Sequence, residues 1–153
     1  QGLWGTVSSI KIAEKKQTCT ITLPAATEAA NTAAAPTFTG NSDLDLVNTD
    51  LTTSPAATIN YPLTLGVGTA ANAAQAGYAM FAPQTTGNVV LKIELSSGVT
   101  QTVNVPVPTT PAPAGFLHGH AYEITLKFSS SAITPTVAVA DWVPVTNTPE
   151  VEI

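Results

Sequence analysis

Strict alternation of apolar and polar residues limits the fold of this chain more than any other feature of its sequence. Apolar side chains occupy every second position of one segment: Tyr122, Ile124, Leu126 and Phe128. Polar or charged residues stand between them. Successive side chains of a β-strand point to opposite faces, so this period of two predicts a strand with one buried face. We therefore expect Tyr122, Ile124 and Leu126 to belong to the structural core.

A second pair of alternating segments predicts a β-hairpin. Leu91, Ile93 and Leu95 share one face of the first segment, and a lysine and a glutamate stand at the positions between them. The Ser-Ser-Gly sequence at 96–98 predicts a turn. The buried side of the returning strand is predicted to consist of alternate valines: Val103, Val105 and Val107.

Shorter strands are expected around this pattern. Residues 6–13 and 18–23 are interpreted as a hairpin, and a break in the alternation at Ser8 and Ser9 predicts a β-bulge in its first strand. Further strands are predicted at 37–40, 44–47, 61–67, 78–82 and 137–139, with a polar turn at 41–43. Two segments are interpreted as connections: the Ala-rich residues 24–36, for which one helical turn is the alternative, and the Pro-rich residues 108–113.

Together these segments predict the fold class. They give roughly nine or ten strands, without a βαβ rhythm or an internal repeat. We therefore predict an all-β fold in which residues 1–153 form a single domain, a two-sheet antiparallel β-sandwich with a Greek-key order. Trp142 follows the last strand and is expected to close one end of the sandwich as part of the core, although it could instead form a sugar-binding platform.

The charged residues argue against several classes of partner. The chain has five lysines, no arginine and ten carboxylates, with a formal net charge of −5. Nucleic acid is a poor partner, because phosphate neutralisation needs clustered cations and base recognition usually needs arginine. An anionic membrane surface is disfavoured for the same reason, and without an apolar run of about 18 residues no membrane insertion is expected. Lys15 and Lys16 are interpreted as the charged tip of a hairpin.

Reactive and metal-binding residues are sparse. The single cysteine, Cys19, alternates with apolar residues in TCTITL and is interpreted as buried, and it has no partner for an intrachain disulfide. His118 and His120 permit a metal pair, but no third ligand is near in sequence, so exposed imidazoles are expected. A calcium site is the alternative to a half-buried strand at three aspartates: Asp43, Asp45 and Asp50. We expect no catalytic site, no metal and no cofactor, because these groups are too few for acyl, phosphoryl or hydride transfer.

Several segments in the second half of the chain occur in a characteristic order. They are YAMFAPQ at 78–84 with NVVLKI at 88–93, GHAYEITL at 119–126, ADW at 140–142 and EVEI at 150–153. In this order they resemble the C-terminal domain of Bacteroidales fimbrillin-like proteins, the type V pilins and their tip and anchor relatives. The resemblance implies a transthyretin-like β-sandwich without a catalytic site, exported to the cell surface or outer membrane. It also implies that residues 1–153 are the C-terminal domain of a longer, two-domain protein.

The resemblance further implies a function. Fimbrillin-like proteins are structural subunits of fimbriae, or form their tip or anchor, and they support cell adhesion. The partners implied for this chain are other pilin subunits, which it would join by β-strand addition. The alternative is a surface adhesin module of a lipoprotein that binds a host protein or a glycan.

Residues 143–153 carry a pattern that suits strand addition. The apolar residues stand at odd positions and would share one face of an extended strand: Val143, Val145, Val151 and Ile153. Such a strand can bury its apolar row in a groove while its backbone completes the edge of a sheet. Asn147 and Pro149 interrupt the pattern. The alternative is that residues 143–153 form the last strand of their own sheet.

Overall fold

The computed structural model describes residues 4–16, 18–21, 36–50, 55, 57–65, 73–110 and 112–140. Within these ranges every regular element is a β-strand and every strand pairing is antiparallel. The predicted all-β fold is therefore confirmed. The strands are β1 (Thr6–Lys15), β2 (Thr18–Thr20), β3 (Thr37–Thr39), β4 (Ser42–Asp45), β5 (Thr49–Asp50), β6 (Ala57–Thr58), β7 (Leu63–Thr64), β8 (Asn88–Leu95), β9 (Thr100–Pro106), β10 (Ala121–Phe128) and β11 (Ile133–Ala140).

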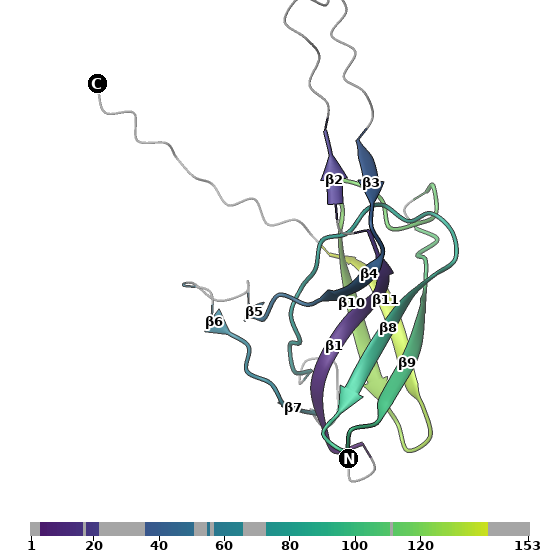
Figure 1. Ribbon diagram of the computed structural model, residues 1–153. Helices are drawn as coiled ribbons and strands as arrows, with labels where there is room; N and C mark the ends of the chain where they lie inside the picture. The colour runs from purple at the N-terminus through teal and green to yellow at the C-terminus, as the bar shows by residue number, and fades with distance from the viewer. Residues whose placement is uncertain are drawn as a thin grey trace, which may run out of the picture.

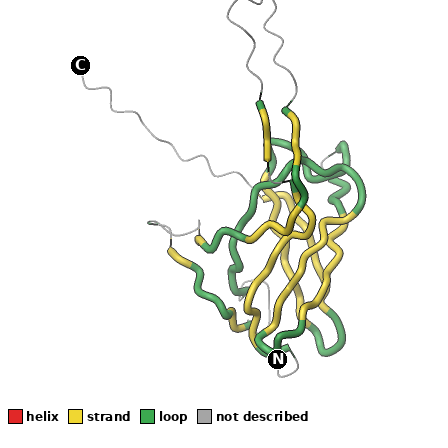
Figure 2. The backbone as a smooth tube through the Cα atoms, in the orientation of Figure 1, coloured by secondary structure: helices red, strands yellow, loops and turns green. Residues whose placement is uncertain are grey.

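The longer strands form two layers. The larger layer is a five-stranded sheet in the order β4-β1-β8-β9, with β7 also paired to β1. β10 and β11 form a two-stranded sheet that lies behind it, as Figure 1 and Figure 2 show. Residues of β9 and β11 lie next to one another across the two layers. This arrangement is consistent with the predicted β-sandwich, whereas the Greek-key order and the transthyretin-like topology stay predictions.

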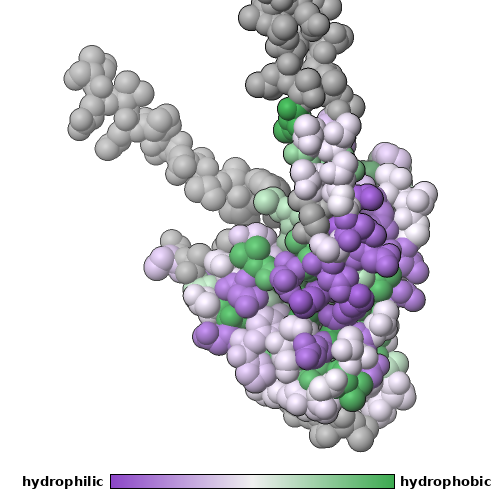
Figure 3. Space-filling model, in the orientation of Figure 1, coloured by the Kyte–Doolittle hydropathy of each residue, from purple (hydrophilic) through white to green (hydrophobic). Residues whose placement is uncertain are grey.

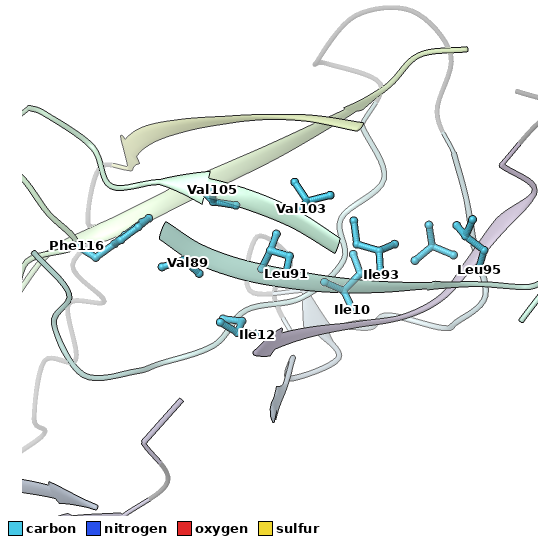
Figure 4. Packing of buried hydrophobic residues seen from close by; sticks show 10 residues of the cluster. Ile10, Ile12, Val89, Leu91, Ile93, Leu95, Val103, Val105 and Phe116 are labelled. Carbon is cyan, nitrogen blue, oxygen red and sulfur yellow. The ribbon is translucent and has the colours of Figure 1, made fainter. Parts of the chain in front are cut away.

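The core lies between the two layers, on the inner face of the larger sheet (Figure 4). The predicted buried faces of β8 and β9 are confirmed, except that Val107 is half-buried and lies beyond the end of β9. Full burial of a Val, Leu or Ile side chain contributes about 1.5–3 kcal/mol, so this cluster is a main source of stability. The buried cluster consists of Val7, Ile10, Ile12, Val89, Leu91, Ile93, Leu95, Val103, Val105 and Phe116.

A β-bulge explains how the broken pattern of β1 still gives one buried face. The pairing of β1 with β8 shifts register between Val7 and Ser9, where the sequence predicts the bulge. An extra residue at this point reverses the order in which side chains alternate. Val7, at an odd position, therefore reaches the same core as Ile10 and Ile12, at even positions.

β10 carries the alternation on which the fold prediction depends. Tyr122, Ile124 and Leu126 are half-buried and pack against the buried cluster. β10 has a described strand partner only on the side of β11, so its side chains are flanked by a neighbouring strand on that side alone.

Three local predictions are wrong. Residues 18–20 pair with β3 rather than with β1, because β8 occupies one edge of β1 while β4 and β7 occupy the other. The polar turn predicted at 41–43 contains the start of β4, since Ser42 pairs with Lys15. β1 consequently continues to Lys15, which is a strand residue and not part of a hairpin tip.

Two other predicted strands are shorter than expected. In the segment 61–67, the described residues include only the two-residue β7, which pairs with β1. In the segment 78–82, only Tyr78 forms a bridge, to Val47. Residues 79–82 are all apolar, so they lack the alternation that gives a half-buried strand its two different faces.

Several predictions lie outside the described residues. These concern residues 24–35 of the Ala-rich connection, Trp142, and the apolar row of Val143, Val145, Val151 and Ile153. In the part of the chain that is described, the structure contains no helix that is long and apolar enough to cross a membrane.

Candidate functional site

An exposed apolar hollow lies between the β2–β3 ribbon and the segment 80–83. Met80 is 86% exposed and Phe38 is 38% exposed. Large apolar side chains that are exposed close together are typical of interaction surfaces. We call this feature the apolar hollow; it is lined by Lys16, Thr18, Cys19, Phe38, Met80, Phe81, Ala82 and Pro83.

Two backbone bridges hold the segment that carries Met80 in place. Before the segment, Val47 and Tyr78 exchange backbone hydrogen bonds of 2.8 and 3.2 Å. After the segment, Gln84 and Phe116 exchange bonds of 3.0 and 2.8 Å. One wall of the apolar hollow is thereby fixed to the sandwich at both ends.

Cys19 forms part of the opposite wall and is exposed, so the prediction that it is buried is wrong. All three residues of β2 are exposed, and Cys19 lies directly opposite Phe38 of β3. A two-stranded ribbon needs a further layer before either of its faces is buried. The alternation in TCTITL therefore reflects the strand but not burial, and the next apolar residue, Ile21, is 66% exposed.

Two lysines lie at the apolar hollow. Lys15 Nζ donates a hydrogen bond to Gln84 Oε1 and lies 4.9 Å from the centre of the Phe81 ring. Partial burial lowers the pKa of Lys15, whereas a cation over an aromatic face favours the charged form. Lys16 lines the hollow itself. The hollow therefore combines apolar walls with positive charge at its margin.

The outer face of the five-stranded sheet is polar, as Figure 3 shows. Lys11 Nζ lies 3.0 Å from Asp45 Oδ1, and Lys92 Nζ lies 2.7 Å from Asp43 Oδ2. Lys11 and Lys92 are direct neighbours on β1 and β8. Like charges opposite each other on a sheet repel, so the two aspartates of β4 offset this repulsion.

These ion pairs occupy two of the three aspartates considered for a calcium site, and the third, Asp50, belongs to β5. Among the described residues, no group of three or more His, Cys, Asp or Glu side chains could hold a metal ion. His118 and His120 are exposed, as predicted. His120 Nδ1 lies 3.0 Å from the backbone oxygen of His118. Among the described residues, no third ligand joins these two histidines.

We expect Asp43 to titrate below its ordinary pKa of 3.8, because Lys92 donates a hydrogen bond to its carboxylate. A depressed folded-state pKa contributes stability that is present above the unfolded value and is lost as the pH falls through the folded value. Lys92→Met is expected to raise the pKa of Asp43 towards 3.8, measured by NMR titration of the carboxyl carbon. The control is Lys127→Met on β10. An unchanged pKa in Lys92→Met would contradict this assignment.

A second hollow, which is polar, lies where the edge of β1 lacks a described strand partner. β7 pairs with β1 at Thr6 and Val7, and β4 pairs with it from Lys11 onward. The gap could hold a small ligand rich in hydroxyl groups, because hydroxyl, amide and carboxylate groups are all present. The lining residues are Ser8, Ser9, Ile10, Asp45, Leu46, Asn48 and Tyr61.

The start of β10 is fixed by its tyrosine. The Tyr122 hydroxyl donates a hydrogen bond of 3.1 Å to the backbone oxygen of Gly115 and accepts one of 3.0 Å from the backbone N–H of Leu117. The Tyr122 ring meets Phe116 edge to face, with their centres 5.0 Å apart. At the other end of β10, the Trp4 ring meets Phe128 edge to face. The Trp4 indole N–H donates a hydrogen bond to the backbone oxygen of Ser129.

The outer edges of the β10–β11 sheet have no strand partner among the described residues. Both strands comprise eight residues, and they are paired with each other along their whole length. An unpaired strand edge presents a row of backbone N–H and C=O groups, which is a template for a further strand. The β2–β3 ribbon is also a separate two-stranded sheet.

No local sequence pattern predicts the apolar hollow. The sequence predicts a strand that contains Met80, a buried position for Cys19 and a short strand that contains Phe38. The run of apolar residues without alternation at 79–82 is the one signal that could have indicated an exposed apolar segment. Comparisons with protein-family models, with curated proteins and with solved structures found no match to this chain.

Proposed function

We propose that this chain is a structural subunit of cell-surface fimbriae, or of the tip or anchor of a fimbrium, and that it joins other subunits by β-strand addition. The observation that carries the proposal is the two-stranded sheet of β10 and β11, whose outer edges have no described partner. Such edges accept strands from other chains unless they are protected. In this proposal the subunit acts outside the cell and through its surface rather than through covalent chemistry.

The donated strand in this proposal is the segment 143–153. Its four apolar side chains at odd positions fit a groove, and its backbone can complete a sheet edge. The polar hollow beside β1 favours the alternative role of an adhesin module. We prefer assembly to this alternative. The β10–β11 edges, which lack a strand partner among the described residues, and the exposed apolar side chains of Met80 and Phe38 support assembly.

Removal of residues 143–153 tests whether this segment serves another subunit or its own fold. We expect the melting temperature to change by less than about 3 °C, which corresponds to roughly 1 kcal/mol for a chain of this size. The measurement is thermal unfolding followed by circular dichroism at a concentration where the chain is monomeric. A much larger loss would mean that the segment is the last strand of its own sheet, and the proposal would then lose its donor.

A further inference from the structure

The polar hollow beside β1 lies where one edge of the larger sheet is interrupted. Thr6 and Val7 pair with β7, and pairing with β4 begins at Lys11, so residues 8–10 have no described strand partner on this edge (Figure 1). We infer that this interruption is a binding site for a single uncharged sugar ring of the pyranose type. Sugar binding there goes beyond the proposed function and does not depend on it, because the hollow belongs to the larger sheet and not to the β10–β11 edges.

The β-bulge of β1 lies at this interruption. Successive side chains of a regular strand point to opposite faces, yet three consecutive residues of β1 line the hollow: Ser8, Ser9 and Ile10. The register shift between Val7 and Ser9 accounts for this difference. Bulges re-aim side chains and are over-represented next to functional sites. The bulge therefore gives the hollow two neighbouring hydroxyl groups, both on half-buried residues.

The other residues around the hollow are held in place by hydrogen bonds. The backbone oxygen of Asn48 accepts a bond of 3.1 Å from the N–H of Ile59, and the Tyr61 hydroxyl donates one of 2.8 Å to the backbone oxygen of Ala76. Asp45 is the strand partner of Lys11. A ligand that enters a site fixed in this way loses less affinity to the ordering of protein groups.

The size and composition of the hollow suit one sugar ring. Its volume is about 200 Å³, which is below the roughly 300–1,000 Å³ of pockets for drug-sized ligands. Apolar and aromatic walls with a few polar groups are typical of small-ligand sites. A sugar ring matches such walls, because it carries both C–H groups and hydroxyl groups. The apolar or aromatic lining residues are Ile10, Leu46 and Tyr61, and the other polar ones are Ser8, Ser9, Asp45 and Asn48.

The polar groups of the hollow include both donors and acceptors. Ser9 Oγ donates to Glu94 Oε2 at 3.1 Å, and its lone pairs can accept a further hydrogen bond. Asp45 Oδ1 lies 3.0 Å from Lys11 Nζ, and a carboxylate has a second oxygen that accepts. The side-chain amide of Asn48 both donates and accepts. Sugar hydroxyl groups also donate and accept, so one ring can pair with all of these groups.

The charges around the hollow favour a ligand without charge. A phosphate or carboxylate ligand would meet the carboxylates of Asp45 and Glu94, whereas an amine would meet the ammonium group of Lys11. Placing like charges next to each other in a complex is costly. The ion pair of Lys11 with Asp45 is already formed, so an uncharged ligand leaves it intact.

NMR titration of the full chain, at a concentration where it is monomeric, tests this site. The probes are glucose, galactose, mannose, fucose and N-acetylglucosamine, each as the free sugar and as its two methyl glycosides. We expect at least one of them to bind in the millimolar range, as is usual for so small a ligand. Its amide shifts should be confined to residues 8–10, 45–48 and 61. Glucuronate is expected to bind at least about threefold more weakly than the best of these sugars, because of its carboxylate.

A pair of asparagine variants tests the assignment of the site. Asn48→Ala is expected to weaken binding of the best probe about two- to tenfold, which is the usual effect of losing one hydrogen bond. The matched control is Asn104→Ala, at an exposed asparagine of β9 in the same sheet, which should leave the affinity unchanged. The amide spectrum of each variant shows directly whether its fold is retained.

The methyl glycosides distinguish two sources of the sugar ring. A methyl glycoside that binds as tightly as the free sugar has its anomeric oxygen in solvent, which is where the rest of a glycan would continue. A free sugar that binds at least about tenfold more tightly than both of its methyl glycosides would instead identify a free monosaccharide as the ligand. Either result supports the site.

Other results would overturn it. The sugar site is wrong if no uncharged probe shifts the amides around the hollow in the millimolar range, if the shifts lie elsewhere, or if Asn48→Ala and Asn104→Ala bind equally well. Glucuronate that binds as tightly as the best uncharged sugar would contradict the class of ligand. A chain that binds sugar but does not associate would contradict the proposed function alone, so failure of one claim is distinguishable from failure of the other.

Discussion

Ile93→Ala is expected to lower the free energy of unfolding by about 2–5 kcal/mol, which is the usual cost of truncating a buried isoleucine to alanine. Ile93 is 0% exposed and lies in β8. β1 flanks it on one side and β9 on the other, where its partners are Ile10 and Gln101. Because paired strands surround this position on both sides, the core has little freedom to collapse into the space that the substitution leaves.

Chemical denaturation followed by circular dichroism measures this loss. The matched control is Val99→Ala in the turn between β8 and β9, since Val99 is 48% exposed. Substitutions at such positions usually change the free energy of unfolding by less than about 0.5 kcal/mol. Similar stabilities for Ile93→Ala and Val99→Ala would show that the cluster on the inner face of the sheet is not the centre of the core.

Gly115→Ala is expected to cost more than about 2 kcal/mol, because steric overlap adds to backbone strain. Gly115 has a φ of +133°, a conformation that residues with a side chain rarely adopt. A Cβ atom there would lie 2.7 Å from Thr85 Cα and 2.9 Å from the backbone oxygen of Gln84. These are backbone atoms, so the overlap cannot be relieved by rotating a side chain.

The control for this substitution is Gly98→Ala, which isolates the effect of the backbone conformation. Gly98 has a φ of +80°, but a Cβ atom there would meet nothing within 4 Å. The left-handed conformation alone costs about 1–2 kcal/mol. Thermal unfolding of both variants should therefore rank Gly115→Ala clearly below Gly98→Ala, and the reverse order would contradict the close approach of these segments. Gly115→Ala also disturbs the Gln84–Phe116 bridge, which holds one wall of the apolar hollow.

The parts of the fold that the sequence predicts well are those that depend on local pattern. β8, the turn at 96–98 and β9 follow one another directly, so alternation and turn residues specify both strands and their pairing. The alternation at 122–128 specifies β10 in the same way. The bulge at Ser8 and Ser9 was also visible, because an extra residue leaves its mark on the alternation itself.

Pairings between distant segments could not be predicted in the same way. β1 pairs with β8 across about seventy intervening residues, and nothing in the local pattern of residues 18–23 shows that this edge is already occupied. The ion pair of Lys92 with Asp43 forms because β4 and β8 lie on either side of β1. The local sequence around Asp43 does not show this lysine, and the acidic segment alone is therefore compatible with a calcium site.

Burial in short ribbons does not follow from local alternation either. Cys19 alternates with apolar residues as a core strand does, but no described strand forms a second layer over β2, and its side chains are exposed. The apolar hollow that Cys19 lines is formed by two segments about sixty residues apart, with Phe38 between them in sequence. Neither segment alone distinguishes an exposed apolar surface from a core strand.

The most direct test of strand-mediated assembly is sedimentation velocity of the full chain beside the chain that lacks residues 143–153, over a range of concentrations. The account predicts that the full chain forms larger species as its concentration rises, whereas the shortened chain sediments as a folded monomer throughout. Association that persists without residues 143–153, or a full chain that remains monomeric at every concentration, would contradict it.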